Sequence, residues 1–236
     1  MKDYSYLDEN FSKIRKRISE AEQRFGIPAG SVRLVGVTKT VDADIINYAI
    51  DNLGLTEIGE NRVQSLLEKY DKLHRDNLKI HFIGSLQTNK VKYIIDKVDL
   101  IKSLDSVRLA AEIDKQAKKI GRTMDVLVEI NSGREPNKGG VMPEDVENFI
   151  DEVQKFDNVR ICGVMTIGPV CEDLTDLKKY FVETCQTFLD ISQKKLHNID
   201  SPILSMGMSR GFEYAIETGS DIVLIGNALF SPGSNI

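Results

Sequence analysis

The sequence predicts a single (β/α)8 barrel, or TIM barrel, with an additional amphipathic helix before the first strand. Three observations predict it: a length of 236 residues, near-continuous apolar runs of strand length, and longer helical patterns between those runs. Apolar strands that alternate with helices are typical of a parallel sheet covered on its outer face, and eight such units indicate closure into a barrel. Because no Pro/Gly/Ser-rich linker interrupts the chain, we expect one domain over residues 1–236.

The N-terminal segment has the apolar spacing of a surface helix. Apolar positions from Tyr4 to Phe25 alternate steps of three and four, and Gly26 and Pro28 end the pattern. A coiled coil would need the seam to continue for more heptads. We therefore expect one helix packed against the rest of the domain.

Eight strands are expected after this helix, with helical segments between them. An open, doubly wound sheet is the alternative, and the lack of a GxGxxG motif after the first strand argues against it. Several helical segments start at an Asp or Asn that could cap the first turn. The expected strands are Leu34–Thr38, Leu55–Ile58, Ile80–Ile83, Leu100–Ser103, Val126–Ile130, Arg160–Met165, Ile203–Ser205 and Ile222–Ile225, and the helical segments start near Asp42, Asn61, Asn89, Asp105, Pro143, Leu174 and Arg210.

Composition excludes several classes of function. The formal net charge of -5 disfavours a nucleic-acid backbone as the main partner. The N-terminus is acidic where a signal peptide would be basic, and no apolar stretch reaches membrane-spanning length, so we expect a cytoplasmic protein away from membranes. Cys162, Cys171 and Cys185 lack CxxC spacing, which argues against disulfides and thiolate metal sites.

Polar and small residues follow the predicted strands, at the end where a barrel builds its active site. Lys39 follows the first strand, Asn61 the second, Ser209 the seventh, and Gly226 and Asn227 the eighth. An ammonium at an apolar barrel mouth would be partly desolvated, which favours the neutral, nucleophilic amine. The alternative for Lys39 is an ordinary solvated surface lysine.

The last two strand ends suggest a place for a phosphate. Barrels of this type often hold one between the loops after strands seven and eight. Ser209 and Gly226 occupy those loops, although an ordinary helix cap and a turn glycine explain them equally well. Together with Lys39, they predict a phosphorylated aldehyde as the ligand.

The three histidines are set aside as catalytic candidates. His81 lies inside a strand and is expected to be a hydrogen-bonded core residue, while His74 and His197 fall in helix or loop surroundings. No His, Cys and carboxylate cluster has metal-ligand spacing. The run NSGREPNKGG at residues 131–140 is a candidate lid over the barrel mouth.

Six motifs resemble the pyridoxal phosphate homeostasis protein family, which is related to the N-terminal barrel of alanine racemase. They are VGVTKT, IGENRVQ, HFIGSLQTNK, GVMTI, SMGMS and GSDIVLIGNALF, in that order along the chain. The resemblance implies a cofactor, pyridoxal 5'-phosphate (PLP), held as a Schiff base on Lys39. It also implies that Asn61, Met208 and Leu224 lie near the cofactor and that Ser209, Gly226 and Asn227 hold its phosphate.

Two stretches depart from the family pattern. Residues 223–227 read VLIGN where the family usually has VRIG followed by Thr or Ser. Leu224 thus replaces the arginine that faces the pyridine nitrogen in this fold, and it can only pack against the ring. Asn227 keeps an amide donor for the phosphate, and Arg210-Gly211 replaces a pair that usually includes Asp or Asn.

The resemblance implies a non-catalytic carrier or regulator in PLP homeostasis, a monomer or weak dimer with PLP-dependent apoenzymes as candidate partners. An amino-acid racemase is the first alternative. Racemisation needs acid-base groups on both faces of the carbanion, and Lys39 supplies one. Because the chain stops at Ile236, we expect no second domain to supply the other, although Tyr214 could substitute. A degenerate barrel that has lost PLP is the second alternative, motivated by Leu224 and Asn227.

Overall fold

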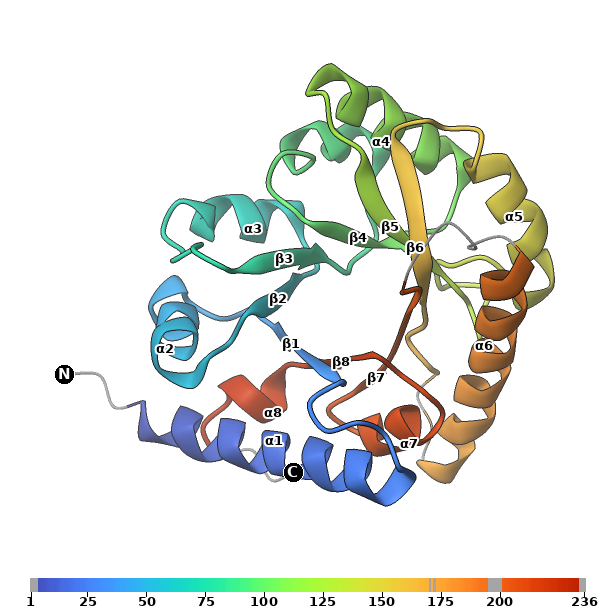
Figure 1. Cartoon of the computed structure of the whole chain (residues 1–236). Helices are drawn as coiled ribbons and strands as arrows, with labels where there is room; N and C mark the ends of the chain where they lie inside the picture. The colour runs from blue at the N-terminus through green and yellow to red at the C-terminus, as the bar shows by residue number, and fades with distance from the viewer. Residues whose placement is uncertain (1–3, 170, 172, 195–200, 234–236) are drawn as a thin grey trace.

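The computed structural model describes residues 4–169, 171, 173–194 and 201–233. Eight parallel strands form a closed barrel in chain order from β1 to β8, and helices surround it (Figure 1). The predicted fold class is confirmed, including the extra N-terminal helix. No helix among the described residues is long and apolar enough to cross a membrane.

All eight predicted strands are present; β8 has the expected bounds, and the others are shifted at one or both ends. The largest correction is β2, which begins later than expected and includes Glu60, because the carboxylate of Glu60 is buried and paired rather than solvated. The seventh strand extends to Met208. The strands are β1 (Arg33–Val37), β2 (Glu57–Glu60), β3 (Lys79–Phe82), β4 (Leu100–Leu104), β5 (Met124–Glu129), β6 (Val159–Met165), β7 (Ile203–Met208) and β8 (Ile222–Ile225).

The helices follow the predicted order, with two corrections. The segment near Asn89 is a 3-10 helix, and Asp42 lies at the N-cap of α2 without a side-chain cap bond, whereas Ser106 Oγ accepts from Leu109 N at 3.3 Å. The helices are α1 (Ser5–Phe25), α2 (Ala43–Leu53), α3 (Val63–Tyr70), η1 (Thr88–Tyr93), α4 (Val107–Lys119), η2 (Pro143–Asp145), α5 (Val146–Val153), α6 (Thr175–Lys194), α7 (Phe212–Glu217) and α8 (Asn227–Phe230).

Helix α1 lies outside the barrel beside α7 and α8 (Figure 1). Its apolar stripe is buried as the spacing predicts, and Gly26 ends the helix in the left-handed conformation with a φ of 68°. Phe11 packs edge-on against Phe230 of α8, with ring centroids 5.8 Å apart. Asn10 Nδ2 donates to Leu229 O at 3.0 Å and to Ser231 O at 3.1 Å. The helix is thereby fastened to the last strand–helix unit.

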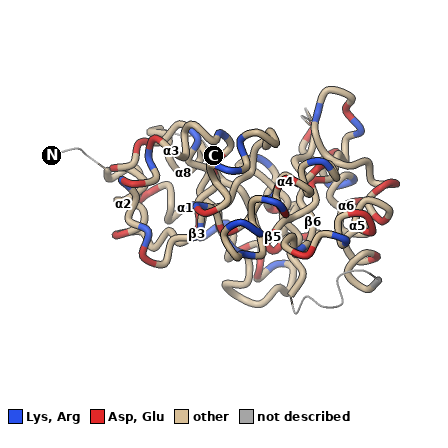
Figure 2. The backbone as a smooth tube through the Cα atoms, turned by 90° about the horizontal axis from the view of Figure 1, so that it is seen from above, with Lys and Arg blue, Asp and Glu red and all other residues tan. Residues whose placement is uncertain are grey.

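Acidic and basic residues are interspersed along the described chain, so the net charge of -5 is not concentrated in one element (Figure 2). The three cysteines are free thiols, and burial is the main cause that raises the pKa of Cys162 to about 11. No three His, Cys, Asp or Glu side chains among the described residues are close enough together to hold a metal ion. His197 lies outside the described residues, and exposed His74 contacts Asp51 at 2.9 Å.

The barrel interior contains a buried polar cluster that the sequence reasoning missed. Lys102 of β4 is fully buried, and its Nζ donates to Ser205 Oγ at 3.2 Å. Burial lowers the pKa of Lys102 to about 7, opposed by the Glu57 carboxylate and assisted by Arg33. His81 is buried as predicted, with Nε2 3.4 Å from Glu57 Oε2, and burial holds its pKa well below the usual range.

This cluster predicts a specific pH dependence of stability. In the unfolded chain Lys102 titrates near 10.5, and in the folded protein near 7. Between those values the unfolded state holds one more proton, so the free energy of unfolding should rise with pH by roughly 1.4 kcal/mol per unit relative to Lys102→Met. Urea denaturation of both proteins from about pH 7 to pH 9.5 measures the difference. If the free energies of unfolding of the two proteins change with pH in the same way, Lys102 remains protonated in the folded state.

Candidate functional site

Strand register brings the ends of β1 and β2 to the same level. Val37 of β1 is paired with Gly59 of β2. Lys39 lies two residues beyond Val37, and Asn61 lies two residues beyond Gly59, so both positions lie at the C-terminal rim. Asn61 Oδ1 is buried and has no hydrogen-bond partner among the described residues. A buried acceptor of this kind is costly unless a ligand or water satisfies it.

The rim continues across the seam between β1 and β8. Gly36 is paired with Ile225, so Gly226 stands beside Val37, and a Cβ added at Gly226 would lie 3.4 Å from the Val37 Cβ. Asn227 follows at the start of α8 and is exposed. Because Gly226 has no side chain, a ligand can approach its backbone closely.

The end of β7 supplies the next part of the rim. Met208 is paired with Leu224 of β8 and also forms a bridge with Gly211, so Ser209 and Arg210 make the turn between them. The Ser209 side chain is half-buried, whereas Met208 is 43% exposed. A cavity of about 200 Å³ opens beside this turn, with Gly207, Met208 and Arg210 in its lining.

Leu224 lies below this rim, inside the barrel. It is buried in an apolar cluster with Val35, Ile83 and Ile222. From this position the Leu224 side chain can offer only van der Waals contact to a ligand at the barrel mouth.

Lys39 itself lies in a tight turn at the end of β1. Val41 N donates to Thr38 O at 3.0 Å, which closes the turn around Lys39 and Thr40. Both central side chains are exposed, so the expected partial desolvation of Lys39 is wrong for this structure. The reason is local, since Lys39 is one of the two central residues of a tight turn at the rim, where solvent reaches the side chain.

A buried network beneath this turn was not predicted. Lys69 of α3 contacts Glu60 of β2, with Nζ 2.8 Å from Oε1. Ser65 Oγ lies 3.2 Å from Glu60 Oε2 and also 3.2 Å from Lys39 O. A signal was present in the sequence, because Lys69 lies three residues after buried Leu66 and hence on the same helix face.

The candidate lid, residues 131–140, is closed at its base, where Asn131 N donates to Val141 O at 2.9 Å, and is fastened again in its first half. Asn131 exchanges hydrogen bonds with the backbone of Glu135, and Arg134 Nη2 lies 2.6 Å from Glu183 Oε1 on α6. Gly139 of the loop lies beside two carboxylates, since a Cβ added there would be 3.2 Å from Asp105 Oδ2 and 4.0 Å from Glu129 Oε2. Burial and then Asp105 raise the pKa of Glu129 to about 7.

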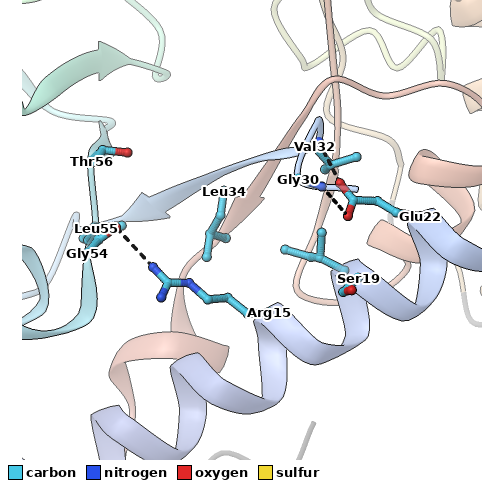
Figure 3. Close-up of a pocket in the computed structure, with 10 residues that line it drawn as sticks. Arg15, Ser19, Glu22, Gly30, Val32, Leu34, Gly54, Leu55 and Thr56 are labelled. Atoms are coloured by element: carbon cyan, nitrogen blue, oxygen red, sulfur yellow. Dashed lines mark hydrogen bonds between the residues drawn. The ribbon is translucent and has the colours of Figure 1, made fainter. Parts of the chain in front are cut away.

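A larger cavity, of about 360 Å³, lies between α1 and the N-terminal ends of β1 and β2 (Figure 3). Its two charged side chains, Glu22 and Arg15, already have hydrogen-bond partners in the protein backbone. Glu22 accepts hydrogen bonds from Gly30 N and Val32 N at 3.0 and 2.9 Å, and Arg15 Nη2 donates to Gly54 O at 3.1 Å. These bonds tie the segment after α1 to that helix and tie α1 to the loop before β2, so we assign this cavity a structural role.

Comparison with known proteins relates the whole chain to one family. The model of the alanine racemase N-terminal domain matches residues 5–232. The pyridoxal phosphate homeostasis protein of Aquifex aeolicus is 45% identical over 222 residues, 94% of this chain and 96% of that protein. The protein of that name from Helicobacter pylori J99 is 34% identical over 234 residues, 98% of this chain and 99% of its own length.

Solved structures agree with this relationship. An unknown protein from Bifidobacterium adolescentis has a TM-score of 0.90 at 33% identity, with 98% of each chain covered. PipY of Synechococcus elongatus, solved with PLP bound, has a TM-score of 0.78 at 28% identity, covering 92% of this chain and all of PipY. Alanine racemase of Clostridium difficile, at 18% identity and a TM-score of 0.71, shares the fold and is covered over 58% of its length. This chain therefore belongs to the pyridoxal phosphate homeostasis protein family.

Proposed function

We propose that this protein binds PLP as a Schiff base on Lys39 and acts as a non-catalytic carrier or regulator in PLP homeostasis. The observation that carries the proposal is the rim itself, where Lys39 and Asn61, after β1 and β2, lie on the same side of the barrel mouth as the turn at Ser209 after β7. Family membership and the PLP-bound relative PipY support the same cofactor.

The residues at the rim fit PLP chemically. Asn61 Oδ1 is a buried acceptor without a partner among the described residues, available to a donor group on the ligand. Ser209 offers a hydroxyl, Asn227 an amide, and Gly226 an open backbone, which together suit a phosphate. Bound PLP would supply an aldehyde that condenses reversibly with amines. In that condensation the Lys39 nitrogen becomes doubly bonded to the aldehyde carbon, and its two protons leave with the aldehyde oxygen as one water.

The site favours carriage over catalysis. Apart from Lys39, the candidate rim residues Asn61, Ser209 and Asn227 carry neutral amide or hydroxyl groups, which are weak acids and bases. Tyr214, the residue considered for a second acid-base group, lies on α7 with its ring packed against the hydrophobic core. Leu224 offers no charged partner to a pyridine nitrogen.

The wider role follows from the exposure of the rim. Exposed Lys39 can be reached by an incoming amine or by another protein, which suits transfer of PLP to PLP-dependent apoenzymes. We propose that residues 1–236 act in the cytoplasm as one PLP-binding domain, as a monomer or weak dimer. A degenerate barrel without PLP is the competing function, and Leu224 is the observation that favours it.

The covalent link can be mapped directly. Purified protein mixed with PLP should develop a visible absorbance band that borohydride removes, and peptide mapping should locate the fixed cofactor on Lys39. Lys39→Ala should lose the band while it remains folded, because an exposed turn residue contributes little to stability. Cofactor fixed on buried Lys102 or on another lysine of the wild-type protein would contradict the assignment of Lys39.

The phosphate contacts can be tested with a matched pair of serine variants. Ser209→Ala should weaken PLP binding by about 1 to 3 kcal/mol, because a hydrogen bond to a charged group is lost. Ser12→Ala, at an exposed position on α1, is the control and should bind as the wild type does. Pyridoxal, which lacks the phosphate, should bind poorly to wild-type protein. If pyridoxal and PLP bind with equal affinity, the proposed phosphate site does not exist.

Racemase activity should be absent or a trace. One acid-base group typically contributes about 10²- to 10⁴-fold, and the proposed site supplies such a group on one face only. We would incubate the PLP-loaded protein with L- and D-alanine and a wider amino-acid panel in deuterated water. Rapid α-deuteration with inversion at ordinary enzymatic rates would contradict the carrier role and show that the protein is an enzyme.

A further inference from the structure

We propose that the buried ion pair between Lys69 and Glu60 is a positioning device for Lys39, acting by clamping both ends of the turn that carries it. The inference rests on the proposed Schiff base on Lys39 and assigns roles to two residues away from the cofactor. Neither residue is a catalytic group, since both act through the backbone of the turn.

Lys69 supplies the clamp. Its ammonium carries three protons, and three acceptors surround it: Thr38 O at 2.8 Å, Val41 O at 3.2 Å and Glu60 Oε1 at 2.8 Å. Thr38 and Val41 are the first and last residues of the turn around Lys39. One buried cation therefore holds the two ends of the turn together from below.

Glu60 anchors the cation and reaches the turn by two further routes. Its side chain is fully buried, and Oε1 also accepts a hydrogen bond from Thr38 Oγ1. Its Oε2 lies 3.2 Å from Ser65 Oγ, which is equally close to Lys39 O. The network thus contacts the backbone of Lys39 itself and links β1, β2 and α3 beneath it.

Stability alone does not account for this arrangement. A buried ion pair gains little net free energy, because the desolvation of two charges offsets most of their attraction, and apolar residues of similar volume often serve as well. Hydrogen bonds with defined directions do fix a geometry. Here they fix the backbone on both sides of Lys39 while its side chain stays exposed. That combination suits a lysine that must meet an aldehyde held elsewhere on the rim.

The test compares a covalent and a non-covalent ligand in Lys69→Met. Pyridoxine 5'-phosphate carries an alcohol in place of the aldehyde, so its affinity reports on the pocket without the bond to Lys39. Formation of the borohydride-sensitive band with PLP should slow by roughly ten- to a hundred-fold, while the affinity for pyridoxine 5'-phosphate changes by less than about two-fold. Lys72→Met, at an exposed position just after α3, is the matched control and should behave as wild type.

A second variant tests the same inference if Lys69→Met does not fold. Lys69→Met leaves the Glu60 carboxylate buried without its cation, which can destabilise the protein. The double variant Glu60→Gln/Lys69→Met removes both charges and should fold, yet it still lacks the clamp and should show the same slow band formation. A cofactor-free measurement follows the Val41 amide, whose hydrogen exchange should accelerate in both variants because the turn opens more often.

The outcomes separate this inference from the proposed function. Band formation at the wild-type rate in both variants, or an equal loss of affinity for PLP and pyridoxine 5'-phosphate, would overturn the positioning role. Wild-type protein that never develops the band would refute the Schiff base on Lys39 instead. In that case the exchange rate of the Val41 amide still decides whether Lys69 clamps the turn.

Discussion

Hydrogen bonding between β1 and β8 closes the barrel, and this closure brings the candidate residues after the first two strands together with those after the last two. The register pairs Val35 with Leu224 and Gly36 with Ile225. It brings the end of the first strand, with Lys39 just beyond it, to the end of the last strand, where Asn227 follows. Helix α1 covers this part of the barrel through its contacts with α8. The apolar spacing of the N-terminal segment is thus also part of what builds the site.

The sequence was most informative where structure depends on local periodicity. Apolar runs predicted all eight strands, and the three-four spacing predicted α1 to within a residue. The errors fall where contacts come from elsewhere in the chain. Glu60 was expected beyond the second strand, and its burial in β2 depends on Lys69 from the next helix. The cap at Asp42 failed because suitable residue type does not fix side-chain geometry.

For the candidate site too, positions in the fold could be predicted and side-chain contacts could not. Lys39, Asn61, Ser209 and the residues after β8 could be predicted to share a rim, because strand order alone brings strand ends together. Their individual surroundings could not. Lys39 is exposed although desolvation was expected. Lys102 lies in the predicted strand Leu100–Ser103 but was not considered as a site residue, and it is fully buried. Whether a lysine is buried depends on partners distant in sequence, here Ser205 from a strand on another side of the barrel.

We propose one PLP carrier in which a reactive lysine on an exposed turn, a clamp beneath that turn and a phosphate site on the adjoining part of the rim act together. A crystal structure of the PLP-loaded protein tests this claim most directly. We predict continuous electron density between Lys39 Nζ and the aldehyde carbon of PLP, with the phosphate in contact with Ser209 and with the backbone at Gly226 and Asn227. Cofactor density on Lys102 or on a surface lysine, with the rim empty, would contradict it.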